Sequence, residues 1–150
     1  MAAGRLDILT AVKTALEGIT TGNGYHQTVK TVERIAKGWA ELAPGEKPWM
    51  GYWPGREVYE YQLSHRIRCT FTLWVVGHVA HKTVADRYTY LERLSDDTIR
   101  ALRQSVVRAG CAESITLKST ETDEGSAEAF NEGSILMEFD IVYYRNEPTS

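Results

Sequence analysis

The longest regular pattern in the chain is an alternation of apolar and polar residues from Leu63 to Val76. One side of this stretch, read as an extended chain, carries Leu63, His65, Ile67, Cys69, Phe71, Leu73 and Val75; the other carries Ser64, Arg66, Arg68, Thr70, Thr72 and Trp74. Side chains of a strand alternate between its faces, so the pattern predicts a strand with one buried and one wetter face. Fourteen residues at roughly 3.3 Å each span about 45 Å, which is long for a strand. We therefore expect it to extend past the domain core and to offer its edge to a neighbouring molecule.

Two segments have the three- and four-residue spacing of amphipathic helices. The first is Leu6–Glu17, with a stripe of Leu6, Leu9, Val12 and Leu16. The second is Val84–Arg108, with a stripe of Tyr88, Leu91, Leu94, Ile99, Leu102 and Val106. Glycine favours helix ends, so we expect the helices to end at Gly18 and Gly110. A kink is expected at Ser95–Asp97.

Shorter segments predict further strands. Thr28–Lys37 has helical spacing but strand-favouring residue types, and its position after a glycine turn favours a strand. Ser114–Ser119 predicts a short strand, and Ser134–Tyr144 alternates again over a longer stretch. The connections Gly77–Thr83 and Thr120–Gly133 are expected to be loops.

Two helices and about five strands, without regular βαβ alternation, predict an α+β fold. We expect a mostly antiparallel or mixed sheet of about five strands, with both helices packed on one face. The length of 150 residues suits one domain over 1–150, and 43% hydrophobic with 25% charged residues is typical of a globular chain.

No apolar run approaches the ~20 residues that span a bilayer, and the first residues lack a secretory signal. Cys69 and Cys111 form no motif, which predicts two reduced thiols in a cytosolic protein.

Aromatic residues are concentrated in Ala43–Tyr61, which also holds three of the four prolines and three glycines. This composition excludes a long regular element and leaves room for a short strand around Trp49–Trp53. Aromatics in such a stretch need a covering surface, either their own sheet edge or a second molecule. Because Tyr, Trp and Arg are enriched in interface hot spots, we name a candidate subunit or partner interface. Its residues are Trp49, Tyr52, Trp53, Arg56, Tyr59, Tyr61, Arg66 and Arg68.

Charge is distributed unevenly along the chain, whose formal net charge is −3. Residues 1–118 hold 16 Lys and Arg against 12 Asp and Glu, a balance of +4, whereas residues 119–144 hold seven acids and no base, a balance of −7. The acids are Glu121, Asp123, Glu124, Glu128, Glu132, Glu138 and Asp140. Such a block is a solvated loop or a surface that repels a polyanion.

The sequence contains no signature of a catalytic, nucleotide or metal site. We therefore expect no enzyme activity, no metal and no cofactor. His78 and His81 lack a further ligand and are expected in a solvated loop that a partner can contact, while His65 is expected to be at least half-buried. Arg66 and Arg68 beside Trp74 suggest a nucleic-acid platform, but the net negative charge opposes it.

In the order and texture of its elements, the chain resembles the tail terminator (tail completion) proteins of long-tailed bacteriophages. The likeness covers most of the chain and involves Leu6–Glu17, the turn at Gly24–Tyr25 leading to Thr28–Ile35, Pro48–Tyr61, Ile67–Val76, Tyr88–Leu102 and Met137–Tyr144. The head–tail connector (neck) proteins of phages have a similar size and organisation and stay an alternative. A small binding domain or enzyme of another family is the third possibility.

The resemblance implies a structural virion protein at the head-proximal end of the tail, assembled in the host bacterial cytoplasm. It implies a hexameric ring that caps the tail tube, ends tube polymerisation and provides a docking surface for the head. The expected partners are further copies of the chain, the tail tube protein and a head-completion or connector protein, with no membrane. DNA would pass through the ring without specific binding. We expect Glu121, Asp123, Glu124, Glu128 and Glu132 to face this channel or its rim, because carboxylates discourage phosphate binding.

Overall fold

The computed structural model describes residues 4–35, 48–80, 83–123 and 132–146. Its helices and helical turns are α1 (Arg5–Glu17), η1 (Thr21–Asn23), η4 (Leu63–His65), α2 (Val84–Leu102) and the π-helical turn η5 (Arg103–Val107). Its strands are β1 (Thr31–Glu33), β2 (Trp49–Tyr61), β3 (Arg66–Ala80), β4 (Ser114–Asp123) and β5 (Glu132–Asn146).

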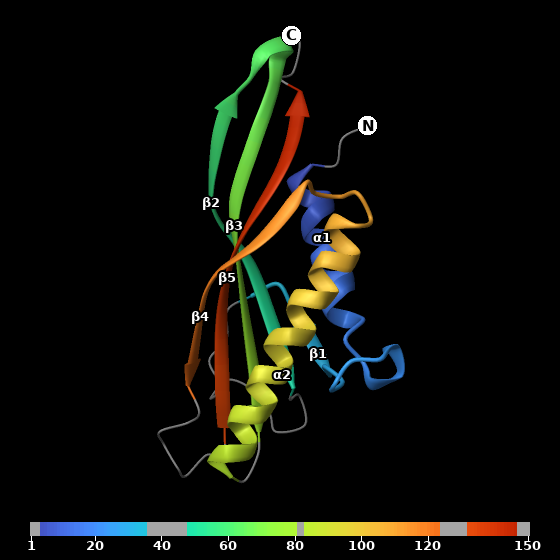
Figure 1. The fold of residues 1–150 in the computed structure, drawn as a ribbon, viewed down its shortest axis with the longest axis vertical. Helices are drawn as coiled ribbons and strands as arrows, with labels where there is room; N and C mark the ends of the chain where they lie inside the picture. Colours follow the sequence, from blue (N-terminus) through green and yellow to red (C-terminus); the bar gives the residue numbers. More distant parts are fainter. Residues whose placement is uncertain (1–3, 36–47, 81–82, 124–131, 147–150) are drawn as a thin grey trace.

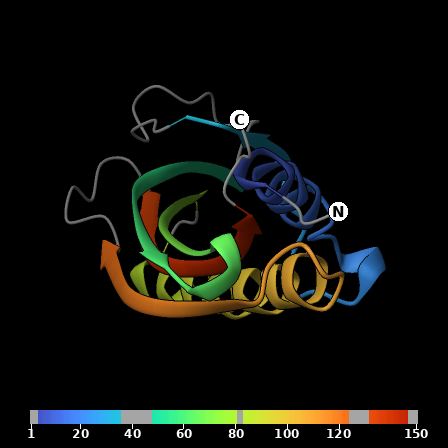
Figure 2. The same ribbon diagram turned by 90° about the horizontal axis from the view of Figure 1, so that it is seen from above.

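The five strands form one mixed sheet in the order β1-β2-β3-β5-β4. β1 runs parallel to β2, and every other neighbouring pair is antiparallel. The strands twist around the long axis of the molecule, and the helices lie along one side of the sheet (Figure 1). Viewed along that axis, the sheet is strongly curved (Figure 2). The predicted α+β fold, with a five-stranded mixed sheet and two helices, is confirmed.

The main core lies between the helices and one face of the sheet. β3 contributes the alternating row Ile67, Cys69, Phe71, Leu73 and Val75, as the sequence pattern predicted. The paired strand β5 contributes Ile135, Met137, Phe139, Ile141 and Tyr143. Both helices bury apolar side chains in this same cluster. The alternation of residue types along two long strands therefore determines which face the helices cover.

Helix α1 follows its predicted stripe except at one position. Its buried side chains are Ile8, Leu9, Val12, Ala15 and Leu16. Leu6 is 69% exposed, which corrects the predicted stripe. At the first turn, the Asp7 carboxylate accepts the N–H of Gly4 at 3.0 Å, which satisfies one of the free N–H groups at a helix start.

Helix α2 does not kink at Ser95–Asp97 as predicted, and runs unbroken to Leu102. Asp97 is buried, and its carboxylate accepts the N–H of His26 at 3.0 Å. This residue thus ties the turn after α1 to the helix instead of facing water. The irregularity comes later, in the π-helical turn η5.

Strand β2 is longer than the sequence predicted, since it continues through Pro54 and Gly55 to Tyr61. The register with β3 shifts from Pro54↔Leu73 to Glu57↔Phe71, so the proline and glycine lie at a bulge. Proline removes a donor but is tolerated at bulges and on edge strands. Strand β4 is also longer than the predicted Ser114–Ser119. Its register with β5 shifts after Leu117, and the strand continues beyond this irregularity to Asp123.

Strand β3 is shifted toward the C-terminus relative to the predicted Leu63–Val76. Leu63–His65 form a turn, and His65 is exposed with a positive φ of 63°, so the expectation that it is half-buried was wrong. Gly77 to Ala80 continue the strand because β5 pairs with them. His78 is therefore buried in the sheet, with its ring centroid 5.4 Å from that of Trp49, and does not lie in a solvated loop. His81 lies outside the described residues.

Candidate assembly interface

Strands β2 and β3 form a hairpin whose far end stands clear of both helices (Figure 1). We call residues 58–70 of this hairpin the arm. Its strands pair from Val58↔Thr70 to Tyr61↔Ile67, and β5 continues along the other side of β3. Within the described residues, β1 pairs only with the first three residues of β2, so no strand pairs with the outer edge of the arm. A free strand edge is a template for pairing with another chain.

Exposed apolar side chains are concentrated on this arm. Among the described residues seven large hydrophobic side chains are exposed, and four of them lie on the arm: Val58 (51%), Tyr59 (47%), Tyr61 (67%) and Leu63 (92%). Leu6, at the start of α1, is another. Apolar side chains that gather on a projecting element, beside an unpaired strand edge, are typical of a protein contact surface.

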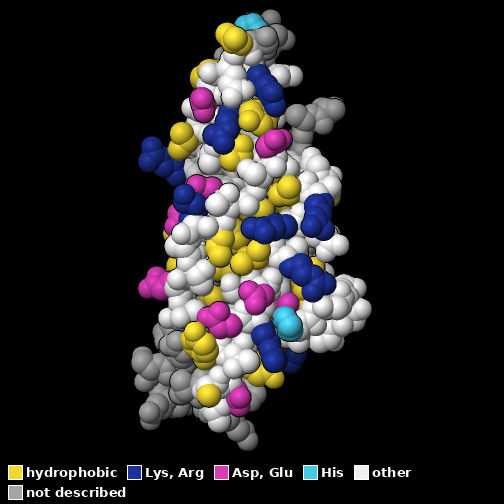
Figure 3. Space-filling view, viewed as in Figure 1, with side chains coloured by type: hydrophobic (Ala, Val, Ile, Leu, Met, Phe, Trp, Pro, Cys, Tyr) yellow, Lys and Arg dark blue, Asp and Glu magenta, His cyan; other side chains and the backbone are white. Residues whose placement is uncertain are grey.

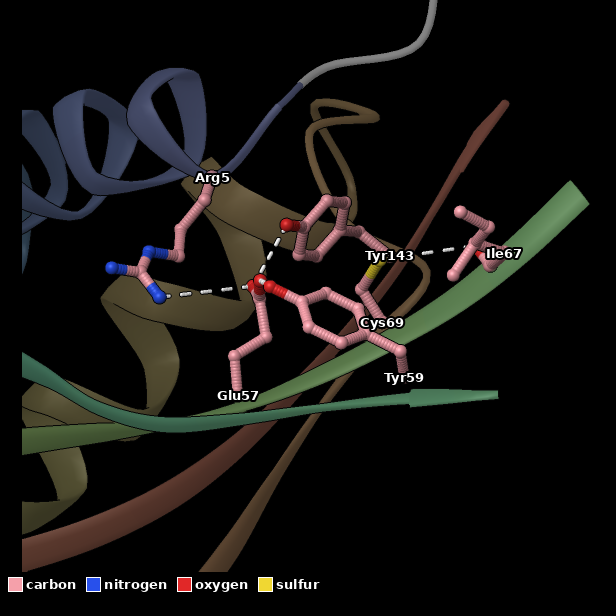
Figure 4. Close-up of polar contacts among 6 residues, drawn as sticks. All are labelled: Arg5, Glu57, Tyr59, Ile67, Cys69 and Tyr143. Atoms are coloured by element: carbon pink, nitrogen blue, oxygen red, sulfur yellow. Dashed lines mark hydrogen bonds and ion pairs between the residues drawn. The ribbon is translucent and has the colours of Figure 1, made fainter. Parts of the chain in front are cut away.

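The base of the arm is held by a buried carboxylate, Glu57, whose side chain is 8% exposed (Figure 4). The hydroxyl of Tyr143 donates to Glu57 Oε1 at 2.8 Å, and the hydroxyl of Tyr59 donates to Oε2 at 2.5 Å. The Arg5 guanidinium lies 4.0 Å from Oε1. A carboxylate removed from water needs such donors, and here they come from α1, β2 and β5. We call Arg5, Glu57, Tyr59 and Tyr143 the Glu57 cluster.

Both tyrosines of the Glu57 cluster stay protonated at neutral pH. Burial, followed by the hydrogen bond to Glu57, raises the pKa of Tyr143 far above its usual range. The hydrogen bond to Glu57 also raises the pKa of Tyr59. Burial raises the pKa of the Cys69 thiol beneath them, so it is a packed thiol and not a reactive thiolate. The cluster is therefore a set of fixed hydrogen bonds that orients the arm.

Cations stacked on aromatic rings stiffen the arm on both faces. The Arg145 guanidinium lies 5.1 Å from the ring centroid of Tyr59, and that of Arg66 lies 3.8 Å from the ring centroid of Tyr144. Such contacts contribute about 0.5–1 kcal/mol each at exposed sites. An arm that is rigid before association loses less conformational entropy when it binds.

The structure divides the eight predicted interface residues into three groups: two that are buried, the half-buried Trp53, and five at the bulge or on the arm. Trp49 and Tyr52 are buried inside the chain, 0% and 3% exposed, so we remove them from the candidate interface. Trp49 lies on the sheet face away from the helices, in a second apolar cluster with Val76, Leu136 and the half-buried Trp53. The remaining predicted residues, Arg56, Tyr59, Tyr61, Arg66 and Arg68, lie at the bulge or on the arm.

Sequence reasoning missed three residues that the structure places at this interface. Glu57, Val58 and Leu63 fall in or beside a stretch that was read as loop-like because of Pro54 and Gly55. The available signal for a continued strand was the group of β-branched and aromatic residues after Pro54 and Gly55, namely Val58, Tyr59 and Tyr61. Nothing local to Glu57 indicates its burial, because its buried partner Tyr143 is 86 residues away.

The predicted acidic channel residues are only partly described. Glu121 is exposed on β4. It pairs with Leu136, a residue on the sheet face away from the helices. Asp123 is the last residue of β4, and Glu132 is the first residue of β5. Glu124 and Glu128 lie outside the described residues.

Within the described ranges, no three His, Cys, Asp or Glu side chains are grouped so that they could hold a metal ion. In the same part of the chain, no helix is long and apolar enough to cross a membrane. The comparisons with known proteins find no family model that matches the chain and no match among curated proteins.

Proposed function

We propose that the chain is a structural virion protein whose copies form a ring that caps a phage tail tube, ends its polymerisation and docks the head. The observation that carries the proposal is the arm, with its unpaired edge and four exposed apolar side chains. The order and texture of the elements, which resemble those of tail terminator proteins, supply the biological setting.

In the proposed ring, the arm of one copy meets a different surface on the next copy. The arm is a single projecting surface at one end of the molecule, and the Glu57 cluster fixes its direction relative to α1. A surface that meets a different surface on the next copy makes a head-to-tail contact, and such contacts close into rings when the rotation allows it. A hexamer, contact with tail tube protein and contact with a head-completion or connector protein are parts of the same proposal.

The sheet face away from the helices suits the wall of a channel for DNA. Along β3 this face carries Thr70 and Thr72, and the paired strand β5 carries Glu138 and Asp140. Of the two arginines that β3 places on this face, Arg68 lies 3.8 Å from Glu60, and Arg66 lies 3.8 Å from the ring centroid of Tyr144. Lys118 lies 3.9 Å from Asp140. Cations already paired with carboxylates leave few free contacts for phosphates. DNA would therefore pass without specific binding.

The test is the mass of the purified chain by light scattering at low and high micromolar concentration, with negative-stain images, alone and with tail tube protein. A ring, or a monomer that becomes a ring only on tube protein, supports the proposal. A monomer at every concentration that binds neither tube nor connector protein overturns it. A ring that binds only head-connector protein assigns the chain to the neck instead.

The arm is tested by the double variant Tyr61→Ser/Leu63→Ser. Both side chains are exposed, so the monomer should keep its stability while association is lost. The matched control is Tyr88→Ser on α2, because Tyr88 is 48% exposed and lies away from the arm. Equal association by the arm variant and the control would count against this role of the arm.

A further inference from the structure

Three neighbouring hollows form a continuous groove from α2 to the end of β5. The first, of about 530 Å³, is lined by Asp96, Ile99, Arg100, Arg103, Gln104 and Arg108. The second, of about 230 Å³, shares Arg103 and Arg108 with the first and adds Val107 and Glu113. The third, of about 430 Å³, shares Val107 and Glu113 with the second and reaches Tyr144. We call the three hollows together the arginine groove.

The α2 end of the arginine groove carries guanidinium groups that the described chain leaves unused. Arg100 is fixed in place, because it donates to the carbonyl of Gly24 at 3.1 Å and lies 4.3 Å from the ring centroid of Tyr25. Arg103 and Arg108 are exposed, and their guanidinium groups have no ion pair or hydrogen bond with any described residue. Figure 3 shows several Lys and Arg side chains gathered over α2. Guanidinium groups bind carboxylates with two parallel hydrogen bonds, so this end suits an acidic ligand.

The other end of the arginine groove is an open strand edge. β4 begins at Ser114, which pairs with Val142, and the N–H of Glu113 donates to the carbonyl of Val142 at 2.8 Å. Beyond this point no described strand pairs with the β4 side of β5, while β3 pairs with its other side as far as Asn146. Backbone groups of alternate residues point to the same edge of a strand. The N–H and carbonyl of Tyr144 therefore point the same way as those of Val142, toward the third hollow.

An extended peptide is the ligand that suits both ends. Only a polypeptide offers the alternating N–H and C=O groups that add a strand to an open edge. A single nucleic-acid strand needs exposed aromatic rings on which its bases stack. In the groove, Tyr143 is buried and the ring of Tyr144 stacks on the guanidinium of Arg66. Between the two ends, the half-buried Ile99 and Val107 offer contacts to apolar side chains of a peptide.

We propose that the arginine groove binds an extended acidic segment of a partner protein. The segment adds a strand to the free edge of β5 and pairs its carboxylates with Arg103 and Arg108. Main-chain hydrogen bonds supply affinity, and the arginines select for acidic residues. The arm offers the outer edge of β2, whereas the groove lies on the β5 side of β3, so the two surfaces are separate. The inference therefore does not depend on the proposed ring.

The experiment measures peptide binding by fluorescence anisotropy. The probe is a fluorescein-labelled peptide of twelve residues, half alternating Thr and Val and half alternating Glu and Ser, made with the acidic half at either end. The control peptide has Lys in place of Glu. The acidic peptide should bind and should lose at least about tenfold in affinity between 0.1 and 1 M salt, as the Debye length falls from about 10 Å to about 3 Å.

Charge variants test the arginines. Arg103→Gln/Arg108→Gln should bind the acidic peptide at least about tenfold more weakly than wild type, because two donors of charge-assisted hydrogen bonds are lost. The matched control is Lys13→Gln/Lys30→Gln, which removes the same charge from two exposed lysines that line none of the three hollows. This control should bind like wild type.

Strand addition is tested on the unaltered chain, so that no variant needs to fold. A peptide N-methylated at alternate residues of its Thr and Val half keeps its charge but loses N–H donors. It should bind at least about fivefold more weakly than the unmethylated peptide. Amide hydrogen exchange of Tyr144 should slow when the unmethylated peptide is bound.

Absence of binding at millimolar peptide, or equal binding by the lysine or the N-methylated peptide, overturns the inference while the proposed ring stands. Tighter binding of single-stranded oligo-dT also overturns it and assigns the groove to nucleic acid. Peptide binding that is lost when rings form assigns the groove to a contact between copies and overturns it as well. Peptide binding by a chain that forms no ring supports the inference while the proposed function fails.

Discussion

Replacing Tyr143 by Phe tests whether the Glu57 cluster holds the base of the arm. The change removes one hydroxyl and keeps the ring, which packs edge-on to Phe71 with ring centroids 6.1 Å apart. Glu57 Oε1 then loses its 2.8 Å hydrogen bond, and Arg5 at 4.0 Å is too distant to replace it. The buried carboxylate then keeps the hydrogen bond from Tyr59 to Oε2, while Oε1 has lost its hydroxyl donor.

The expected cost follows from the burial of both partners. Tyr143 is 4% exposed and the Glu57 side chain 8%, so water does not readily replace the lost donor. A hydrogen bond to a charged group contributes about 1.5–3 kcal/mol. We therefore expect Tyr143→Phe to lower the free energy of unfolding by about 2 kcal/mol. For a chain of this size the Tm should fall by about 4–8 °C.

The measurement is urea unfolding followed by tryptophan fluorescence, with the m-value compared to detect any change in the unfolded state. The control is Tyr144→Phe, the same chemical change on the opposite face of β5, where the ring stacks on Arg66 and does not contact Glu57. A loss in Tyr143→Phe no larger than in this control would refute the reasoning. A double-mutant cycle with Glu57→Leu should show strong coupling, because Tyr143→Phe removes the donor and Glu57→Leu removes the acceptor of the same hydrogen bond.

Three further predictions use the same unfolding assay. Gly77→Ala should cost about 1–3 kcal/mol, because a Cβ there would lie 2.5 Å from Leu94 Cδ2. Gly51→Ala should cost more, since the obstacle 2.3 Å away is the backbone carbonyl of Ile35, which yields less than a side chain; equal losses would contradict this. The folded-state pKa of Tyr143 lies above the unfolded value of about 10, so its contribution is complete below pH 10 and is lost above it; the urea midpoint should fall above pH 10, less steeply in Tyr143→Phe.

Part of the candidate interface was accessible from residue types alone. Aromatic and arginine residues between Trp49 and Arg68 indicated a contact surface, and Tyr59, Tyr61 and Arg66 do lie on the projecting arm. Trp49 and Tyr52 have the same composition signal but are buried. The difference depends on their position along β2: the first half of the strand is covered by the chain and the second half stands clear of it. Residue type indicates only that a side chain favours burial. It does not indicate whether its own chain or a second molecule buries it.

The sequence by itself determined the local elements and the fold class. Period-two alternation assigned the buried row of β3, and the helical stripes assigned α1 and α2 apart from Leu6 and Tyr88, which are exposed. These periods depend only on backbone geometry and on the preference of apolar side chains for burial.

Only the tertiary structure decided the rest. The bulge at Pro54 depends on pairing with β3, the burial of His78 depends on where β5 begins, and the Glu57 cluster joins residues from three elements. Each of these contacts connects residues that are distant along the chain. Their energies depend on register and packing that local patterns do not contain, so they appear only when the sheet has assembled.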